Sequence, residues 1–382
     1  MKILINGPTL ENANLVPLLK KIAYWQKKQP DVNITIVGDE KLKQQIQALN
    51  IIKKPYHFYD LPTTKNIDNR LRLMVEGLKR NFWLITNYQK FTDFEVVYSI
   101  SSVLDLVIFP YFLKKKNPKI IWVTNFDNLV PITDPGNKLI RFLAWLFFQI
   151  SLRMIKKADI IFTISPELVS FLTKKGIDKE KIVLGSYGVE AELIKKAKRG
   201  KNYLYDALFV GRINETKGIY DMLKVLSIIK KKIPHFKLAI MGQALGKTKD
   251  QFCQAINKKS LEKNVVFLGF KSGLEKFTIF KNSRCFWFLS KSESESFGIA
   301  LMEAVCSGLP AFTYNLPIYD RLYKNGEIIS SPKGDYQTVA KKVLALFKKG
   351  DFSNRSGERL LKKYSWDQVA QTELTQFLAK MK

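Results

Sequence analysis

The sequence predicts an α/β protein that consists of two doubly wound parallel-sheet domains in tandem. Apolar runs of strand length alternate with helix-length segments along almost the whole chain, as in a parallel sheet covered by helices. The chain has 382 residues, whereas a single core stops growing at about 250–300 residues. The alternation is interrupted once, over residues 191–202, where basic residues replace most of the large apolar ones.

In the first half, each expected strand is a short, mainly apolar run, as strands buried on both faces are. The expected strands are Lys2–Asn6, Val32–Val37, Glu95–Ile100, Lys119–Thr124, Asp159–Ile164 and Lys181–Leu184. The helical segments between them are Leu15–Lys27, Leu42–Leu49, Leu71–Tyr88, Val103–Lys115, Leu139–Lys156 and Glu167–Lys174. We therefore expect a first domain over residues 1–190, followed by a linker over residues 191–202.

The second half repeats the alternation and predicts a second domain over residues 203–365. Its expected strands are Asp206–Val210, Phe236–Met241, Asn264–Leu268, Cys285–Leu289, Pro310–Thr313 and Glu327–Ser330. In the last segment, residues 366–382, apolar side chains recur at the spacing of an amphipathic helix, which needs a surface to cover. We expect this helix to pack back on the first domain.

The composition is that of a folded protein, with 46% hydrophobic and 25% charged residues. It excludes collagen-like and low-complexity chains and argues against bulk disorder. The three cysteines, Cys253, Cys285 and Cys306, are too few for a disulfide framework and lack the spacing of a zinc site. This cysteine usage favours a reducing compartment such as the cytoplasm.

No secretory signal and no membrane-spanning helix are expected. The apolar run at the start of the chain is broken by Gly7 and Pro8, unlike the core of a signal peptide. The longest apolar stretch, Leu139–Met154, contains Arg141 and Arg153 and falls short of the roughly 18–20 residues that a span requires.

The net charge is +29, from 63 Lys and Arg against 34 Asp and Glu. The excess is spread over both halves of the chain, which argues against a nucleic-acid-binding arm, and we expect no nucleic-acid partner. Two interpretations stay open: a lysine-rich background that aids solubility, or attraction to an anionic membrane surface. Leu71–Tyr88 and Leu139–Met154 mix apolar and basic residues, as interfacial helices do and as core helices also do.

Ligands of open α/β sheets bind beyond the carboxyl ends of the strands, so the loops after the strands are the candidate site. After Asp206–Val210 comes the loop Gly211–Gly218, which carries Arg212 and Lys217 just before a helix. Such a pair can clamp a diphosphate, with a planar guanidinium fork and a mobile ammonium. The alternative is that so basic a chain places some cations in every loop.

A second candidate loop follows the strand Cys285–Leu289. It is rich in small residues and enters a strongly helix-forming segment at Gly298, so backbone N–H groups and the positive helix end would face an anion. Glu295 precedes that helix and Glu303 lies inside it, where each could accept hydrogen bonds from ligand hydroxyls. The alternative is a capping Glu295 and a solvated Glu303.

The series of motifs resembles the retaining glycosyltransferases of GT-B fold, family four, the group 1 type. The resemblance covers nearly the whole chain and is most specific within residues 206–315, where two glutamates stand eight positions apart. The matching pieces, in order, are Phe209-Val210-Gly211-Arg212, Lys217-Gly218, Met241-Gly242, Phe267-Leu268-Gly269-Phe270, Glu295-Ser296-Phe297-Gly298, Glu303-Ala304 and Gly308-Leu309-Pro310.

The resemblance implies two Rossmann-like domains that face each other across a cleft, with a nucleotide-sugar donor held mainly by the second. Arg212 and Lys217 would neutralise the diphosphate, Glu295 would contact the donor sugar, and Glu303 would hold the ribose. The remaining implied donor contacts are Gly7, Gly211, Phe270 near the base, the backbone of Phe297 and Gly298, and Ile299. Neither a cofactor nor a metal is implied, and no Asp-x-Asp motif occurs.

The activity that the resemblance implies is transfer of a hexose to a saccharide or lipid-linked acceptor, in the assembly of cell-envelope polysaccharide or glycolipid. Such an enzyme would be cytoplasmic, with contact at the inner face of the cell membrane if the acceptor is lipid-linked. Two alternatives are a catalytically silent sugar-nucleotide-binding protein and a sugar-nucleotide epimerase of the same fold.

The first domain departs from the family pattern at two places. The turn after the first strand reads Gly7-Pro8, where many members have two glycines, and Phe126 stands where many have a histidine. The usual catalytic histidine therefore cannot be transferred to this chain. The neighbouring Asp127 is a candidate for contact with the acceptor hydroxyl or the donor sugar, and a purely structural turn role is the alternative.

Overall fold

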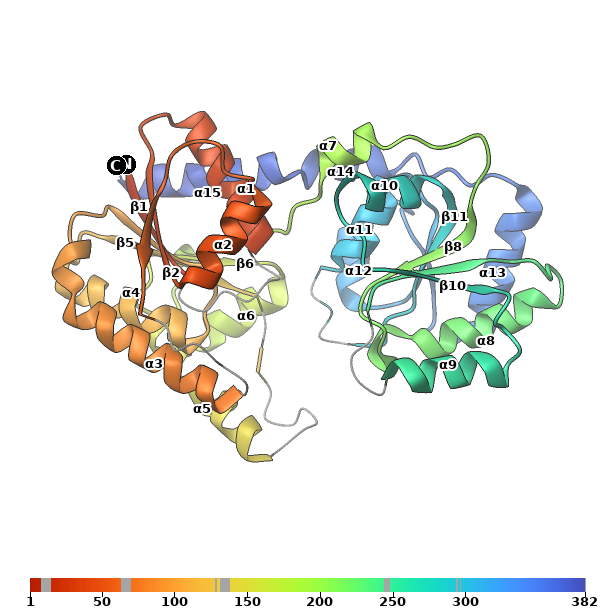
Figure 1. The fold of residues 1–382 in the computed structure, drawn as a ribbon, viewed down its shortest axis with the longest axis horizontal. Helices are drawn as coiled ribbons and strands as arrows, with labels where there is room; N and C mark the ends of the chain where they lie inside the picture. Colours follow the sequence, from red (N-terminus) through yellow and green to blue (C-terminus); the bar gives the residue numbers. More distant parts are fainter. Residues whose placement is uncertain are drawn as a thin grey trace. The chain divides into compact units, whose positions relative to one another are not determined.

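The computed structural model describes residues 1–7, 15–62, 70–127, 129–130, 138–243, 248–292, 295 and 297–381, without the side chains of residues 70–74. The chain divides into two compact units (Figure 1). Unit 1 comprises Met1–Gly188 together with Trp366–Lys382, and unit 2 comprises Val189–Ser365. Each unit is built on a parallel β-sheet covered by helices, which confirms the predicted fold class.

The sheet of unit 1 has the strand order β3-β2-β1-β4-β5-β6-β7, and all its pairings are parallel. Strand order reverses between β1 and β4, so the loops that follow these two strands diverge at the carboxyl edge. The strands are β1 (Lys2–Asn6), β2 (Asn33–Gly38), β3 (His57–Asp60), β4 (Val96–Ser99), β5 (Ile121–Phe126), β6 (Ile160–Thr163) and β7 (Ile182–Leu184).

Helices cover both faces of this sheet because alternate strand residues point to opposite sides. In β1, Ile3 and Ile5 join one buried cluster with α1, α2 and α15, whereas Leu4 joins another with α3, α4, α5 and α6. The helices are α1 (Leu15–Lys28), α2 (Glu40–Leu49), α3 (Arg70–Thr86), α4 (Leu104–Lys116), α5 (Lys138–Ile155), α6 (Pro166–Lys174) and α15 (Trp366–Met381).

The C-terminal helix α15 packs on the first unit, as the amphipathic pattern predicts. Ala370, Leu374 and Phe377 complete the same core as Trp25 of α1. The indole N–H of Trp25 donates to the carbonyl of Ala370 at 3.0 Å, and its ring meets Phe377 edge to face at 5.1 Å. The two ends of the chain therefore build one hydrophobic layer.

Unit 2 has the strand order β10-β9-β8-β11-β12-β13, again with parallel pairings. Its strands are β8 (Tyr205–Val210), β9 (Leu238–Met241), β10 (Val265–Gly269), β11 (Ser283–Phe288), β12 (Ala311–Tyr314) and β13 (Ile329–Ser331). Its helices are α7 (Ala191–Lys196), α8 (Ile219–Lys230), α9 (Thr248–Lys258), α10 (Gly273–Lys281), α11 (Ile299–Cys306), α12 (Pro317–Leu322), α13 (Tyr336–Lys349) and α14 (Gly357–Lys363).

Two elements differ from the sequence-based expectation. The edge strand β3 was not predicted, because it begins with His57, ends with Asp60 and buries neither face fully. Residues 191–202, predicted as a linker, begin with the short helix α7, whose Ile194 is buried. Ile194 and Ala197 are buried and Leu193 is half-buried, so a short apolar face holds this helix in a segment that is otherwise basic.

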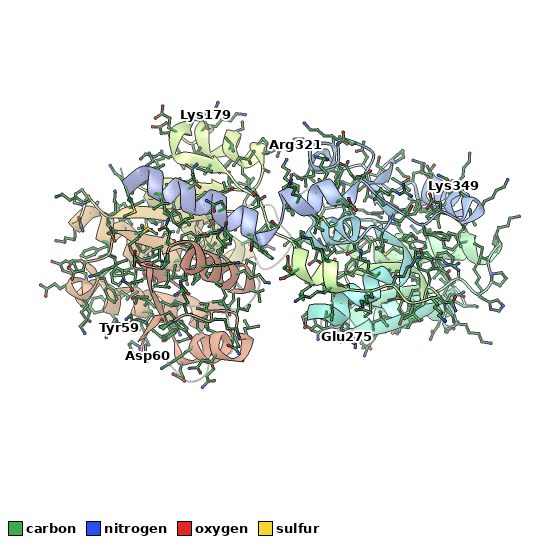
Figure 2. All side chains as sticks on the ribbon, turned by 90° about the horizontal axis from the view of Figure 1, so that it is seen from above. Tyr59, Asp60, Lys179, Glu275, Arg321 and Lys349 are labelled. Carbon is green, nitrogen blue, oxygen red and sulfur yellow. The ribbon has the colours of Figure 1, made fainter. Side chains whose placement is uncertain are left out.

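The surface of both units is basic. Figure 2 labels Lys179 in unit 1 and Lys349 in unit 2, both of which are exposed. Within the described residues, no helix combines the length and apolarity needed to cross a membrane.

Candidate functional site

The candidate site of unit 2 lies where strand order reverses. Strands β8 and β11 are neighbours in the sheet. After β8 the chain continues to β9 on one side of this pair, and after β11 it continues to β12 on the other side. The loop Gly211–Gly218 follows β8 and the loop that contains Glu295 follows β11. Such a switch point at the carboxyl edge is where open α/β sheets bind ligands.

Close backbone approach joins these two loops. Gly218 adopts a left-handed conformation with φ of 75°, and a Cβ there would collide with the carbonyl of Leu289 at the end of β11. The N–H of Lys291 donates to the carbonyl of Thr216 at 2.9 Å. Only glycine permits this approach at 218, which fixes the position of Lys217 relative to the β11 loop.

Lys217 and Glu295 form an ion pair across the two loops. The ammonium of Lys217 lies 2.6 Å from Glu295 Oε2, and the hydroxyl of Ser290 donates to the same oxygen at 2.9 Å. Both charged side chains are largely buried, and the ammonium also lies 5.4 Å from the ring centroid of Phe288. The sequence predicts both as donor contacts, and the structure brings them together.

Arg212 behaves differently from Lys217. Its side chain is exposed and makes no ion pair with any residue that the structure describes. The neighbouring Gly211 lies against Gly242, where a Cβ would collide with the Gly211 carbonyl. The loop is therefore closely packed on the β9 side, while the guanidinium of Arg212 can turn toward a ligand.

The loop after β11 enters helix α11 through Gly298, which has φ of 65°. The side chain of Phe297 is buried edge to face on Tyr364, with 5.3 Å between ring centroids, so its backbone is the part near the helix end. Ile299 begins α11 and is partly exposed. Phe270, which follows β10, is 70% exposed and offers a free aromatic face.

Glu303 is buried inside α11, contrary to its alternative reading as a solvated helix residue. Its carboxylate accepts a hydrogen bond from the ammonium of Lys276, on α10, at 2.7 Å. Burial raises the pKa of Glu303, and Lys276 opposes that rise. A buried carboxylate with one cationic partner keeps lone pairs available for ligand hydroxyls.

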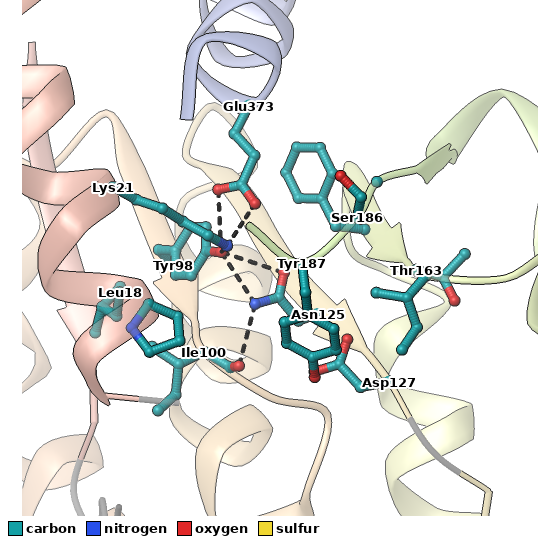
Figure 3. Close-up of a pocket in the computed structure, with 14 residues that line it drawn as sticks. Leu18, Lys21, Tyr98, Ile100, Asn125, Asp127, Thr163, Ser186, Tyr187 and Glu373 are labelled. Atoms are coloured by element: carbon teal, nitrogen blue, oxygen red, sulfur yellow. Dashed lines mark hydrogen bonds and ion pairs between the residues drawn. The ribbon is translucent and has the colours of Figure 1, made fainter. Parts of the chain in front are cut away.

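In unit 1, Asp127 lies just beyond the carboxyl end of β5. It lines a cavity of about 30 Å³ (Figure 3), which is large enough for a water molecule. Burial raises its pKa to about 6, while a hydrogen bond with Tyr187 and the charge of Lys21 lower it. At neutral pH the carboxyl is mostly ionised, and its pKa lies only about one unit below the pH.

The same cavity contains a buried ion pair that sequence reasoning missed. Lys21 of α1 lies 2.5 Å from Glu373 of α15. The hydroxyl of Tyr98 donates to Glu373 at 3.3 Å and accepts a hydrogen bond from the side-chain amide of Asn125 at 3.0 Å. Burial disfavours the charged ammonium, but the charges and hydrogen bonds of Glu373 and Tyr98 together outweigh this effect and raise the pKa of Lys21. The sequence signal that could have revealed this pair is a charged residue on the apolar face of each helix, Lys21 in α1 and Glu373 in α15.

Gly7 and Phe126, the other two first-domain positions considered in the sequence, contact the sheet and the buried core. Gly7 directly follows β1, and its N–H donates to the carbonyl of Val37 at 3.2 Å. Phe126 is fully buried and stacks on Phe171 with 5.9 Å between ring centroids. The side chain at the position of the family histidine is therefore part of the core.

Among the predicted site residues, Gly7 and Asp127 belong to unit 1 and the others belong to unit 2. The described residues contain no group of three or more His, Cys, Asp or Glu side chains placed to hold a metal ion.

Residues 190–363 match the sequence profile of the family described as Glycosyl transferases group 1. An uncharacterized glycosyltransferase of Methanocaldococcus jannaschii is 28% identical over 338 residues, which cover 83% of this chain and 73% of that protein. The GDP-mannose:cellobiosyl-diphosphopolyprenol alpha-mannosyltransferase of Xanthomonas oryzae pv. oryzae is 27% identical over 167 residues, which cover 42% of this chain and 43% of that enzyme.

The fold is also found among solved structures. The crystal structure of Anabaena Alr3699/HepE in complex with UDP and glucose superposes with a TM-score of 0.71 at 14% identity, and the match covers 99% of each chain. At this identity the likeness concerns the fold.

Proposed function

We propose that the protein is a group 1 glycosyltransferase that transfers a hexose from a nucleoside-diphosphate sugar with retention of anomeric configuration. The match of residues 190–363 to the group 1 family and the similarity to the Methanocaldococcus jannaschii glycosyltransferase support this proposal. The acceptor in this proposal is a saccharide or a lipid-linked acceptor, in the assembly of cell-envelope polysaccharide or glycolipid. Two similar proteins support these classes: the Xanthomonas relative is named for GDP-mannose and a diphosphopolyprenol acceptor, and the Anabaena structure contains UDP and glucose.

The observation that carries the proposal is the Lys217–Glu295 pair at the switch point of the group 1 domain. A donor diphosphate would attract Lys217 and Arg212, and Glu295 would turn to the hydroxyls of the donor sugar. As the nucleoside diphosphate leaves, negative charge builds on its phosphate, and the two cations stabilise that charge. Glu303 would hold the ribose, and Phe270 would lie against the base.

We further propose that the reaction needs no metal ion, because Lys217 and Arg212 supply the positive charge at the diphosphate. Turnover should then be the same with and without EDTA. Turnover that stops in EDTA and returns with added Mg²⁺ or Mn²⁺ would contradict this part of the proposal.

The first experiment is thermal stabilisation of the purified protein by a panel of nucleoside diphosphates and sugar nucleotides, since ligands of the native state raise its stability. One sugar nucleotide should raise the melting temperature, and Glu303→Gln should reduce that shift. Glu262→Gln, at an exposed glutamate of the same unit, is the matched control. No shift with any sugar nucleotide would contradict the proposed donor site.

Turnover is tested with the donor so identified. Lys217→Ala should lower kcat by about 10²–10³, the scale of a lost transition-state donor, whereas Lys201→Ala, at an exposed lysine of unit 2, should not change it. Retention is read from the anomeric proton coupling of the product. Inversion would contradict the retaining assignment alone.

A second candidate function is a sugar-nucleotide-binding protein without turnover. The observation that favours it is Phe126, which is buried in the core at the place of the family histidine. Donor binding without transfer or donor hydrolysis, over a broad panel of acceptors, would select this candidate.

A further inference from the structure

Tyr319, in helix α12 of unit 2, is a buried tyrosine whose hydroxyl group has no partner among the described residues. The residue is only 1% exposed, and its hydroxyl makes no hydrogen bond with any residue that the structure describes. Buried polar groups are nearly always hydrogen-bonded, because burial removes them from water. An unpaired hydroxyl of this kind is explained if its partner comes into reach when a ligand binds.

The topology places Tyr319 at the candidate site of unit 2. Helix α12 follows β12, which is the neighbour of β11 in the parallel sheet. The chain leaves both strands at the same edge, so Tyr319 lies at the edge where the loop with Glu295 begins. The ring contacts the start of α11, since a Cβ built on Gly298 would lie 3.6 Å from Cε1 of Tyr319. Cε1 adjoins the carbon that carries the hydroxyl, so the hydroxyl end of the ring faces the start of α11.

The carboxylate of Glu295 is close enough for its charge to act on this hydroxyl. Burial and the negative charge of Glu295 both raise the pKa of Tyr319, so the phenol stays protonated and can donate a hydrogen bond. The two described hydrogen bonds to the Glu295 carboxylate, from Lys217 and Ser290, both end on Oε2. Oε1 is therefore the oxygen that can accept from a further donor.

Binding of a donor changes the partners of Glu295. In the proposed function, on which this inference rests, the donor diphosphate attracts Lys217 and Glu295 turns to the hydroxyls of the sugar. The carboxylate then loses the ammonium that lies 2.6 Å from Oε2, although its side chain is largely buried. A buried carboxylate without a cation needs hydrogen-bond donors to remain ionised and fixed in direction.

We propose that Tyr319 is a positioning residue of the donor site: its hydroxyl donates to Glu295 Oε1 when the donor diphosphate draws Lys217 away. The hydroxyl then takes over from the ammonium as the partner that keeps Glu295 charged and directed at the sugar. Tyr319 acts through Glu295 and does not itself contact the reacting atoms.

The melting temperature of unit 2, measured without donor, tests the contact between the two side chains. Tyr319→Phe in the wild-type protein should leave this temperature unchanged or raise it, because the change removes an unpaired buried hydroxyl. Lys217→Ala takes the cation from Glu295 before any donor is added. In this background Tyr319→Phe should lower the melting temperature by about 2–4 °C, the effect of one lost hydrogen bond in a domain of this size.

Tyr323→Phe is the matched control. Tyr323 is also buried, its hydroxyl also has no partner among the described residues, and its ring centroid lies 6.0 Å from that of Tyr319. Its pKa is raised by burial and by charges that do not include Glu295. The effect of Tyr323→Phe on the melting temperature should therefore be the same with Lys217 and with Ala at position 217.

Donor binding tests the contact in the proposed reaction, with UDP-glucose and GDP-mannose as the probes. Tyr319→Phe should weaken binding of the accepted sugar nucleotide by about ten-fold, the effect of a lost hydrogen bond to a charged group, whereas Tyr323→Phe should not change it. In a Glu295→Ala background, Tyr319→Phe should cause no further loss, because the hydroxyl acts through the Glu295 carboxylate.

Any of three results would overturn the inference: an effect of Tyr319→Phe on the melting temperature that is the same in both backgrounds, donor binding that Tyr319→Phe leaves unchanged, or an equal loss of binding with and without the Glu295 side chain. The last result would place the hydroxyl on the donor itself. A wild-type protein that binds no sugar nucleotide would refute the proposed function, whereas the measurements without donor would still decide whether Tyr319 contacts Glu295.

Discussion

Asp127 combines a polar cavity with a carboxyl group whose pKa burial raises to about 6. If its ionised form contacts the acceptor hydroxyl, turnover falls as pH drops through about 6. Tyr187→Phe removes a hydrogen bond that lowers this pKa, so the acidic limb should move to higher pH. A pH–rate profile of both proteins checks this, and an unchanged limb in Asp127→Asn would exclude Asp127 from catalysis.

The same raised pKa has a consequence for stability. The folded state binds more protons than the unfolded chain between the unfolded pKa, about 3.9, and the folded value of about 6. Stability contributed by this group is therefore present at low pH and is lost as pH rises through that window. Asp127→Asn should stabilise unit 1 at pH 8 by on the order of 1 kcal/mol, with little effect at pH 3.5.

Gly218 offers a test of the close contact between the loop Gly211–Gly218 and the loop after β11. Gly218→Ala imposes a strained left-handed residue and a collision with the Leu289 carbonyl, so the Lys217–Glu295 pair should open and turnover should fall by more than ten-fold. Gly350→Ala is the matched control, since its φ is 73° with nothing within 4 Å of the added Cβ. It should cost about 1 kcal/mol of stability and leave turnover unchanged.

At the scale of the element, helix α15 is bound to α1 through a buried charge pair. Lys21→Met leaves the Glu373 carboxylate buried without its cation, which should cost about 3–5 kcal/mol of unfolding free energy. Lys21→Met with Glu373→Leu removes both charges and should recover most of this loss. Chemical denaturation of the single and double variants measures the effect, and an additive loss would contradict the pairing.

The elements that the sequence predicts best are those with strong apolar patterns. The observed bounds of β1 equal the predicted ones, and α1 extends its prediction by one residue at the C-terminal end. The edge strand β3 begins and ends with polar side chains, and α7 lies in a mainly basic segment. Neither therefore shows the apolar pattern from which the other elements are predicted. Of the site, the loops with Arg212, Lys217 and Glu295 are evident from composition, whereas the Lys21–Glu373 pair joins residues 352 positions apart, which no local pattern encodes.

At the scale of the whole molecule, each unit has its own sheet and its own buried core. We expect two calorimetric transitions, since chains with separate domains depart from two-state unfolding. The donor should raise the midpoint temperature of the unit 2 transition, and Lys21→Met should lower the midpoint temperature of the unit 1 transition. A single transition that shifts as one under both changes would contradict independent unfolding of the units.

The return of α15 to unit 1 has a consequence for synthesis on the ribosome. Domains generally fold in the order in which they emerge, N-terminal first. Here unit 2 is one continuous stretch, Val189–Ser365, while unit 1 lacks Ala370, Leu374 and Phe377 of its core until the segment that follows unit 2 has been made. The nascent second unit can thus complete its fold before the first, and the apolar surface around Trp25 stays open to chaperones until α15 is released.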